Sequence, residues 1–144
     1  MGILADFFVA TPEDAREYAM PGGLAAPALR ARLEPAEYKQ FTSLEIGTLW
    51  AILAQEEWNV SRHNLVDDSL EGKEESWLFR FPQPLVELLA TATDSDLASA
   101  NARWAATEEL SCSPTDLLPI TQDLQRLAKK SVATSNPMYL WGSL

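Results

Sequence analysis

Helix start signals recur along the chain and indicate a mainly helical fold. Thr11-Pro12 and Ser113-Pro114 each place a capping side chain before a proline, which is favourable at the first helical position. Acidic residues follow both prolines within one turn, where they interact favourably with the helix dipole. We therefore expect a helix over about 12–19, ended by Pro21-Gly22-Gly23, and a second helix from Pro114 to about Ala133.

Three further segments have helix signals. Thr42 is placed to cap a helix with Glu45 completing a capping box, and the apolar residues that follow indicate the central core helix. A helix of about two turns is expected from Pro84, and another is expected from Asp94. The helix from Asp94 places three apolar residues on one face: Leu97, Ala100 and Trp104.

Short apolar segments between these helices predict strands. Residues 3–10, Trp77–Phe81 and Met138–Trp141 are rich in aromatic and aliphatic side chains. Residues 28–33 alternate leucine or alanine with arginine, which is the period-two pattern of a half-buried strand. About five helices and three or four short strands, without regular alternation, predict an α+β domain that is mainly helical and has a small sheet.

The length and composition predict one globular domain over residues 1–144. Apolar residues make up 47% of the chain and charged residues 22%, as in ordinary globular proteins. Cys112 is the single cysteine, so no intramolecular disulfide forms and a reducing compartment is indicated. The start of the chain lacks the charge pattern of a secretory signal, and no apolar stretch approaches the roughly 20 residues that span a bilayer. We therefore expect a cytoplasmic protein.

The charge balance excludes two classes of partner. The chain has 11 basic and 21 acidic residues, which gives a net charge of −10. Binding to nucleic acid or to anionic lipid requires clustered lysine and arginine, because these residues release the counterions of the phosphates. We therefore expect neither a nucleic-acid-binding nor a membrane-binding protein.

The sequence predicts no cofactor and no metal site. The six glycines are scattered and form no phosphate-binding fingerprint. One histidine, His63, and one cysteine, Cys112, are too few for structural zinc. Residues 67–78 resemble the first half of a calcium loop, but Leu78 stands where the bidentate glutamate is required. A solvated acidic loop is the favoured interpretation of that segment.

Two residues are candidates for acid–base catalysis, His63 and Glu108. His63 is the single histidine and has polar neighbours in sequence, although an exposed or locally hydrogen-bonded loop position is favoured. Glu108 lies four residues after Trp104, near the apolar face of its helix, where burial would raise its pKa; a surface position is favoured. Cys112 precedes a helix N-terminus, which would lower the pKa of its thiol, but an inert small residue is the favoured interpretation.

Four tryptophans, Trp50, Trp77, Trp104 and Trp141, either line an aromatic pocket or fill the core. Their helix and strand positions favour the core. An aromatic pocket would make the protein a small-molecule-binding domain.

The strongest functional signal is an irregular acidic segment at about 57–76. From Glu56 to Glu75 the chain has seven acidic and two basic residues, a net −5 within 20 residues, framed by Trp58 and Trp77. Concentrated charge with aromatic anchors is typical of a surface that attracts a basic protein. The residues expected to bind are Trp58, Asp67, Asp68, Glu71, Glu74, Glu75 and Trp77.

By elimination, the sequence favours a non-enzymatic binding or regulatory protein, such as an immunity-like inhibitor of a basic partner. The alternatives are a small cofactor-free hydrolase that uses His63 and carboxylates, and a small-molecule-binding domain with an aromatic pocket.

Overall fold

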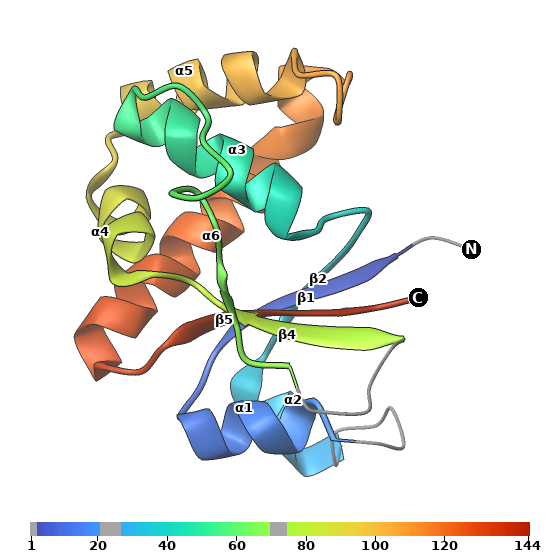
Figure 1. The fold of residues 1–144 in the computed structure, drawn as a ribbon. Helices are drawn as coiled ribbons and strands as arrows, with labels where there is room; N and C mark the ends of the chain where they lie inside the picture. The colour runs from blue at the N-terminus through green and yellow to red at the C-terminus, as the bar shows by residue number, and fades with distance from the viewer. Residues whose placement is uncertain (1–2, 21–26, 70–74) are drawn as a thin grey trace.

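A computed structural model describes residues 3–20, 27–69 and 75–144. In it, a five-stranded antiparallel sheet lies between two layers of helices, with the strands in the order β2-β1-β5-β4-β3 (Figure 1). The strands are β1 (Leu4–Val9), β2 (Ala36–Lys39), β3 (Val66–Asp67), β4 (Ser76–Arg80) and β5 (Met138–Ser143). The helices are α1 (Pro12–Tyr18), α2 (Pro27–Leu33), α3 (Ser43–Ala54), α4 (Gln83–Thr91), α5 (Asp94–Ala105) and α6 (Pro114–Thr134). The predicted α+β class is confirmed, although the sheet has five strands where three or four were expected.

Both faces of the sheet are covered, which explains the apolar sequence of β1. Helices α3 to α6 lie on one face and the short helices α1 and α2 on the other (Figure 1). Phe7 belongs to the larger core, beneath α3 to α6, and Phe8 to the smaller core, beneath α1 and α2. Successive strand side chains point to opposite faces, and both phenylalanines have no exposed surface.

The C-terminal strand β5 is the middle strand of the sheet. It pairs with β1 from Met138 to Ser143 and with β4 from Tyr139 to Ser143. Met138, Leu140 and their neighbours Tyr139 and Trp141 are all buried. The segment expected to be a short final strand therefore connects the two halves of the sheet.

The helix start signals are confirmed. The Thr11 side chain accepts a hydrogen bond from the backbone of Asp14, and at the start of α6 the Asp116 side chain accepts one from the backbone of Ser113. Thr42 begins α3, where its hydroxyl donates to Glu45, although the backbone donor it accepts is that of Leu44. Local chemistry therefore sets where these helices begin.

The prediction of a strand over residues 28–33 is wrong. This segment belongs to α2, in which Leu29 and Leu33 are buried and Ala31 is exposed. Burial of residues four apart is the helical pattern, whereas a strand would bury all three. The edge strand in this region is β2, which follows Pro35. The first helix ends at Tyr18, and Pro21-Gly22-Gly23 lies outside the described residues.

A second difference lies in the segment predicted to be irregular. Val66 and Asp67 form the two-residue strand β3, which pairs with Phe79 and Arg80 of β4. Such a short strand is too small to leave a periodic pattern in the sequence.

None of the described helices is long and apolar enough to cross a membrane.

Candidate functional site

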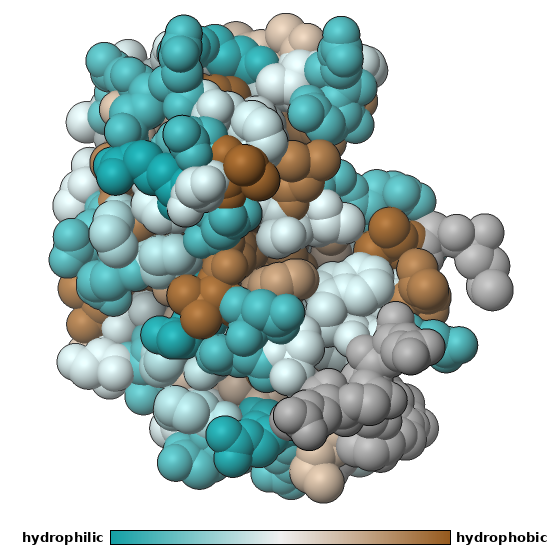
Figure 2. Space-filling view, in the orientation of Figure 1, coloured by the Kyte–Doolittle hydropathy of each residue, from teal (hydrophilic) through white to brown (hydrophobic). Residues whose placement is uncertain are grey.

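A groove of about 680 Å³ lies between α3, α4 and α5. Its apolar lining includes Ala51 and Ile52 of α3, Leu88 of α4 and Ala100 of α5. Hydrophilic side chains cover most of the helical layer in Figure 2, and the apolar surface on this face is divided into small separate patches. The groove therefore combines apolar side chains with polar surroundings.

The charged residues of the groove are mainly acidic. Glu56 and Glu57 follow α3, Asp96 lies in the first turn of α5, and Arg103 is the one basic residue among the described residues of the lining. The hydrogen bond to Arg62 lowers the pKa of Glu56, so its carboxylate is ionised near neutral pH. Among the described residues, the three carboxylates of the lining outnumber the Arg103 guanidinium and Arg62, which pairs with Glu56, so the groove has a net negative charge.

The helix ends at the groove add to this negative potential. Residues near the C-termini of α3 and α4 line the groove, and neither helix has a basic residue in its last turn. A helix C-terminus has the negative end of the macrodipole and is stabilised by cations. At α3 it is followed instead by Gln55, in the left-handed conformation (φ 56°), and by two glutamates.

Trp58 is the aromatic residue of the groove lining and is 46% exposed. A Cβ atom placed on Gly47 would lie 3.7 Å from Trp58 Nε1, so the indole rests beside α3. The following turn is held by the Asn59 side chain, which accepts hydrogen bonds from the backbone of Ser61 and Arg62. Arg62 also forms an ion pair of 2.9 Å with Glu56. Trp58 is therefore an exposed aromatic residue on an ordered segment.

His63 is locally hydrogen-bonded, as favoured from the sequence, but it is buried. Its Nδ1 accepts a hydrogen bond of 2.9 Å from the backbone of Asn59, which places the proton of the neutral ring on Nε2. Nε2 lies 3.6 Å from a carboxylate oxygen of Glu56, and the ring packs edge-on against Trp50. The side chain is only 1% exposed. These contacts hold the loop from Trp58 to His63 in place and leave the His63 side chain little access to a substrate.

The acidic segment is divided between two places. Glu56, Glu57 and Trp58 lie at the groove, whereas the chain from α3 passes to β3 and the region near α1 (Figure 1). There Asp67 and Glu75 are exposed, and Asp68 forms an ion pair of 3.1 Å with Arg80. Trp77 is half-buried in β4 and packs against Gly142 of β5, where a Cβ atom would lie 2.0 Å from the indole nitrogen. Glu71 and Glu74 lie outside the described residues.

The other candidate residues lie away from the groove or at separate positions. Glu108 is exposed, in agreement with the favoured surface position. Burial raises the pKa of the Cys112 thiol, so the helix N-terminus does not activate it. Trp50 and Trp104 belong to the larger core and Trp141 to the smaller core across the sheet. These tryptophans are therefore core residues, as their spacing favours.

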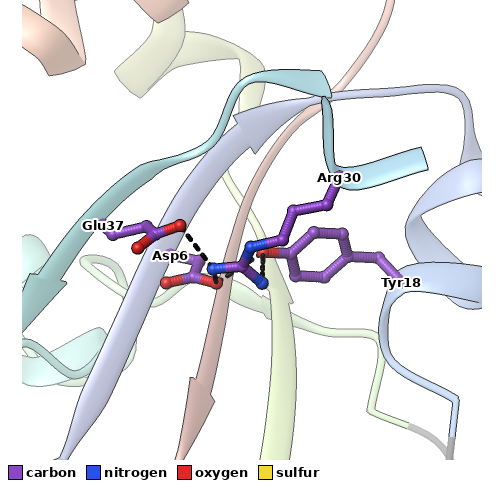
Figure 3. A network of polar contacts seen from close by, with 4 residues as sticks. All are labelled: Asp6, Tyr18, Arg30 and Glu37. Carbon is purple, nitrogen blue, oxygen red and sulfur yellow. Dashed lines mark hydrogen bonds and ion pairs between the residues drawn. The ribbon is translucent and has the colours of Figure 1, made fainter. Parts of the chain in front are cut away.

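A polar network that the sequence did not indicate lies on the face covered by α1 and α2 (Figure 3). Tyr18 donates a hydrogen bond to the carboxylate of Asp6, and Arg30 contacts Asp6 at 3.1 Å, Glu37 at 2.6 Å and Tyr18 at 2.8 Å. Burial raises the pKa of Asp6, and burial together with the hydrogen bond to Asp6 raises that of Tyr18. Every side chain contacts another in the network, so we assign it to joining α1 and α2 to the sheet.

Arg30→Met is expected to lower the free energy of unfolding by about 1–3 kcal/mol near neutral pH, because it leaves the buried Asp6 carboxylate without its cation. The Arg30 side chain is 37% exposed, so solvent screening reduces the effect below that of a fully buried pair. The raised pKa means that the folded state holds the Asp6 proton more tightly than the unfolded state. Asp6 therefore contributes most stability below its ordinary pKa of 3.8 and loses it as the pH rises through the folded value.

Urea unfolding from neutral pH down to the acid limit of folding measures this effect. The deficit of Arg30→Met should shrink with falling pH, since a protonated Asp6 needs no cation. Arg32→Met is the matched control on the same helix: its ion pair with Asp14 involves a side chain that is 62% exposed, so we expect a loss below about 0.5 kcal/mol. Equal losses for the two variants would contradict the assignment.

Comparison with protein-family models, curated proteins and solved structures gave no match. Within residues 3–20, 27–69 and 75–144, no group of three or more histidine, cysteine, aspartate or glutamate side chains is arranged to hold a metal ion. The groove residues themselves are therefore the basis for a functional proposal.

Proposed function

We propose that this protein is a non-enzymatic binding protein that engages a basic protein partner through the groove between α3, α4 and α5. The observation that carries the proposal is a groove whose described lining has three carboxylates and one guanidinium, next to an exposed tryptophan. Aromatic anchors beside complementary charge are common at the centres of protein interfaces. Glu57 and Trp58 are the residues that we expect to contact the partner.

The charge of the whole chain supports the same partner class. A net charge of −10 attracts a cationic protein over a range set by the ionic strength and raises the rate of encounter. Asp67 and Glu75 are exposed on a second part of the surface. We propose that these residues, with Asp68, Glu71 and Glu74, steer the approach of the partner, while the groove supplies the contact. Exposed charges mainly change association rates and add little to stability.

An inhibitor of a basic toxin or nuclease is the specific form of this proposal. An acidic protein that covers a cationic active site needs no catalytic residue of its own, and charge complementarity gives it fast association. A gene for a basic toxin next to the gene for this protein, together with inhibition of that toxin in an activity assay, would support it.

Small-molecule binding is the second candidate, and the size of the groove favours it. Ligand pockets in proteins usually have volumes of about 300–1,000 Å³, and the groove falls within this range. The lining is as polar as it is apolar and has one aromatic residue, whereas most ligand pockets are predominantly apolar. The mixed lining therefore favours a protein partner.

A hydrolase that uses His63 has less support. A general base needs access to the proton that it removes, and the His63 side chain is 1% exposed with Nδ1 already occupied. Glu56 faces Nε2, but Ser61, the hydroxyl residue nearest in sequence, is exposed on the turn.

Charge reversal tests the proposed partner class. Glu57→Lys is expected to slow association with a basic partner by about tenfold or more at low salt, because it reverses a charge at the contact. Reversal of Asp67 and Glu75 together should also slow association, since it reduces steering. Both effects should shrink near 1 M salt, where the screening length falls to about 3 Å. Stopped-flow or surface-based kinetics with the purified partner provides the rates.

Glu87→Lys is the matched control, because Glu87 is exposed on α4 but does not line the groove. It changes the net charge by the same amount as Glu57→Lys, and we expect a smaller effect on association. A basic partner that binds Glu57→Lys and the wild-type protein at equal rates in low salt would refute the groove as the contact site.

A further inference from the structure

We propose that the groove holds one lysine or arginine side chain of the partner, with the cationic group between Trp58 and the C-terminal end of α3. This inference rests on the proposed function and specifies the chemistry that the groove recognises. It depends on four properties of the lining, which are the helix ends, the Glu57 carboxylate, the apolar surface and the position of Arg103.

The helix ends supply a fixed negative potential. The last turn of α3 contributes Leu53 to the lining and α4 contributes Thr91, and neither helix has a cation in its last turn. After α3, the backbone N–H of Gln55 donates a hydrogen bond to the carbonyl oxygen of Ile52, and that of Glu56 donates to Ala51. A cation at this position would interact favourably with both helix dipoles.

Glu57 supplies the carboxylate. Glu56 is occupied by Arg62, with which it forms an ion pair of 2.9 Å, and it also faces His63. Asp96 accepts a hydrogen bond from the backbone of Thr93 in the capping box of α5. In the described part of the chain, Glu57 forms no ion pair and no side-chain hydrogen bond, although it lines the groove. It is therefore the carboxylate free to bind a cation from the partner.

The apolar surface and Trp58 accommodate the rest of such a side chain. Lysine and arginine bury their methylene stems on apolar surface while the charged group remains at a polar rim. Ile52 and Leu88 provide apolar surface in the lining. The exposed indole of Trp58 offers an aromatic face to the cation, and tryptophan is the strongest cation–π partner among the aromatic side chains.

Arg103 limits the groove to one cation. It comes from α5, lines the groove and, among the described residues, forms no ion pair. Its positive charge opposes a second cation and weakens the binding of the first, because like charges within a shared cavity repel. Arg103→Met is therefore expected to raise the affinity for the cationic group. A purely structural role of Arg103 would not produce an increase.

A partner-free probe tests this inference. The probe is N-acetyl-arginine methylamide, and its control is the citrulline analogue, which has nearly the same shape without the charge. The indole N–H resonance of Trp58, assigned from a Trp58→Phe variant, reports binding in two-dimensional NMR titrations. We expect a saturable shift with the arginine probe and at least about tenfold weaker binding of the citrulline probe, since the cation supplies most of the attraction.

The variants make the test specific. Glu57→Gln should lower the affinity for the arginine probe about three- to tenfold, and Arg103→Met should raise it. Glu87→Gln should leave this affinity unchanged. Equal binding of the citrulline probe, or no movement of the Trp58 resonance with arginine, would overturn the inference. If the arginine probe does not bind but a basic partner binds in a charge-dependent way, the cation site in the groove would be refuted and the proposed partner class would stand. If the arginine probe binds but basic proteins show no charge-dependent binding in the kinetic assay, the cation site would be supported and the proposed partner class contradicted.

Discussion

Removal of residues 138–144 is expected to abolish the cooperative folding of the chain. The deleted strand β5 pairs with β1 on one side and β4 on the other, so the sheet would be divided into two parts. Met138, Tyr139, Leu140 and Trp141 are all at least 91% buried. Truncation of a single large core side chain costs about 2–5 kcal/mol, so four such losses, about 8–20 kcal/mol, are as large as the roughly 5–15 kcal/mol of stability of an ordinary domain.

Circular dichroism during urea titration measures the outcome, because this signal does not depend on the deleted Trp141. The expected result is a gradual loss of helix signal without a sigmoidal transition. Deletion of Leu144 alone is the matched control: this residue is 69% exposed, and we expect a change below about 1 kcal/mol. A cooperative transition at the wild-type urea concentration after removal of residues 138–144 would show that the sheet is stable without its middle strand.

The sequence predicted the elements of the fold better than their arrangement. Helices α1, α3 and α5 begin at residues whose side chains cap them, and α6 begins where the Asp116 side chain accepts a hydrogen bond from the Ser113 backbone. Such signals lie within four residues of sequence. The position of β5 between β1 and β4 depends on pairing between residues at least 59 positions apart, which leaves no local signal. The short helix α2 was mistaken for a strand because six residues that alternate leucine and alanine with arginine fit both periodicities.

The candidate site was predicted only in part. Trp58 stood out because it borders the acidic segment, and the structure places it at the groove. Leu88, Asp96 and Arg103 complete the groove, but α4 and α5 reach it through packing of the helical layer, so sequence proximity to Trp58 could not identify them. The division of the acidic residues between two places likewise depends on the path of the chain from α3 to β3.

Gly47 illustrates how a tertiary contact reverses a local preference. In the sequence this glycine counts against the helix that became α3, since glycine in a helix interior costs about 1 kcal/mol relative to alanine. A Cβ atom at Gly47 would lie 2.2 Å from the backbone oxygen of His63. The glycine therefore allows the loop from Trp58 to His63 to pack directly on the helix.

Gly47→Ala is expected to lower the free energy of unfolding by at least about 2 kcal/mol, although helix propensity alone would raise it by about 1 kcal/mol. The cause is the clash with a backbone atom, which cannot rotate away as the end of a side chain can. Displacement of the loop would also separate the His63 ring from that of Trp50, whose centroids lie 5.3 Å apart. It would move Trp58 out of the groove as well. Chemical denaturation gives the stability, and the Trp58 indole resonance reports the displacement.

Ala102→Gly provides the reference for the ordinary effect of a helical glycine. Ala102 is exposed in α5, so its replacement should cost about 1 kcal/mol through helix propensity, with no effect on the Trp58 resonance. Both substitutions exchange alanine and glycine, which differ by one methyl group. We expect the alanine protein to be the more stable at position 102 and the glycine protein at position 47. A Gly47→Ala protein that unfolds at a higher urea concentration than wild type would mean that the loop does not pack on α3, and the position of Trp58 at the groove would lose its structural basis.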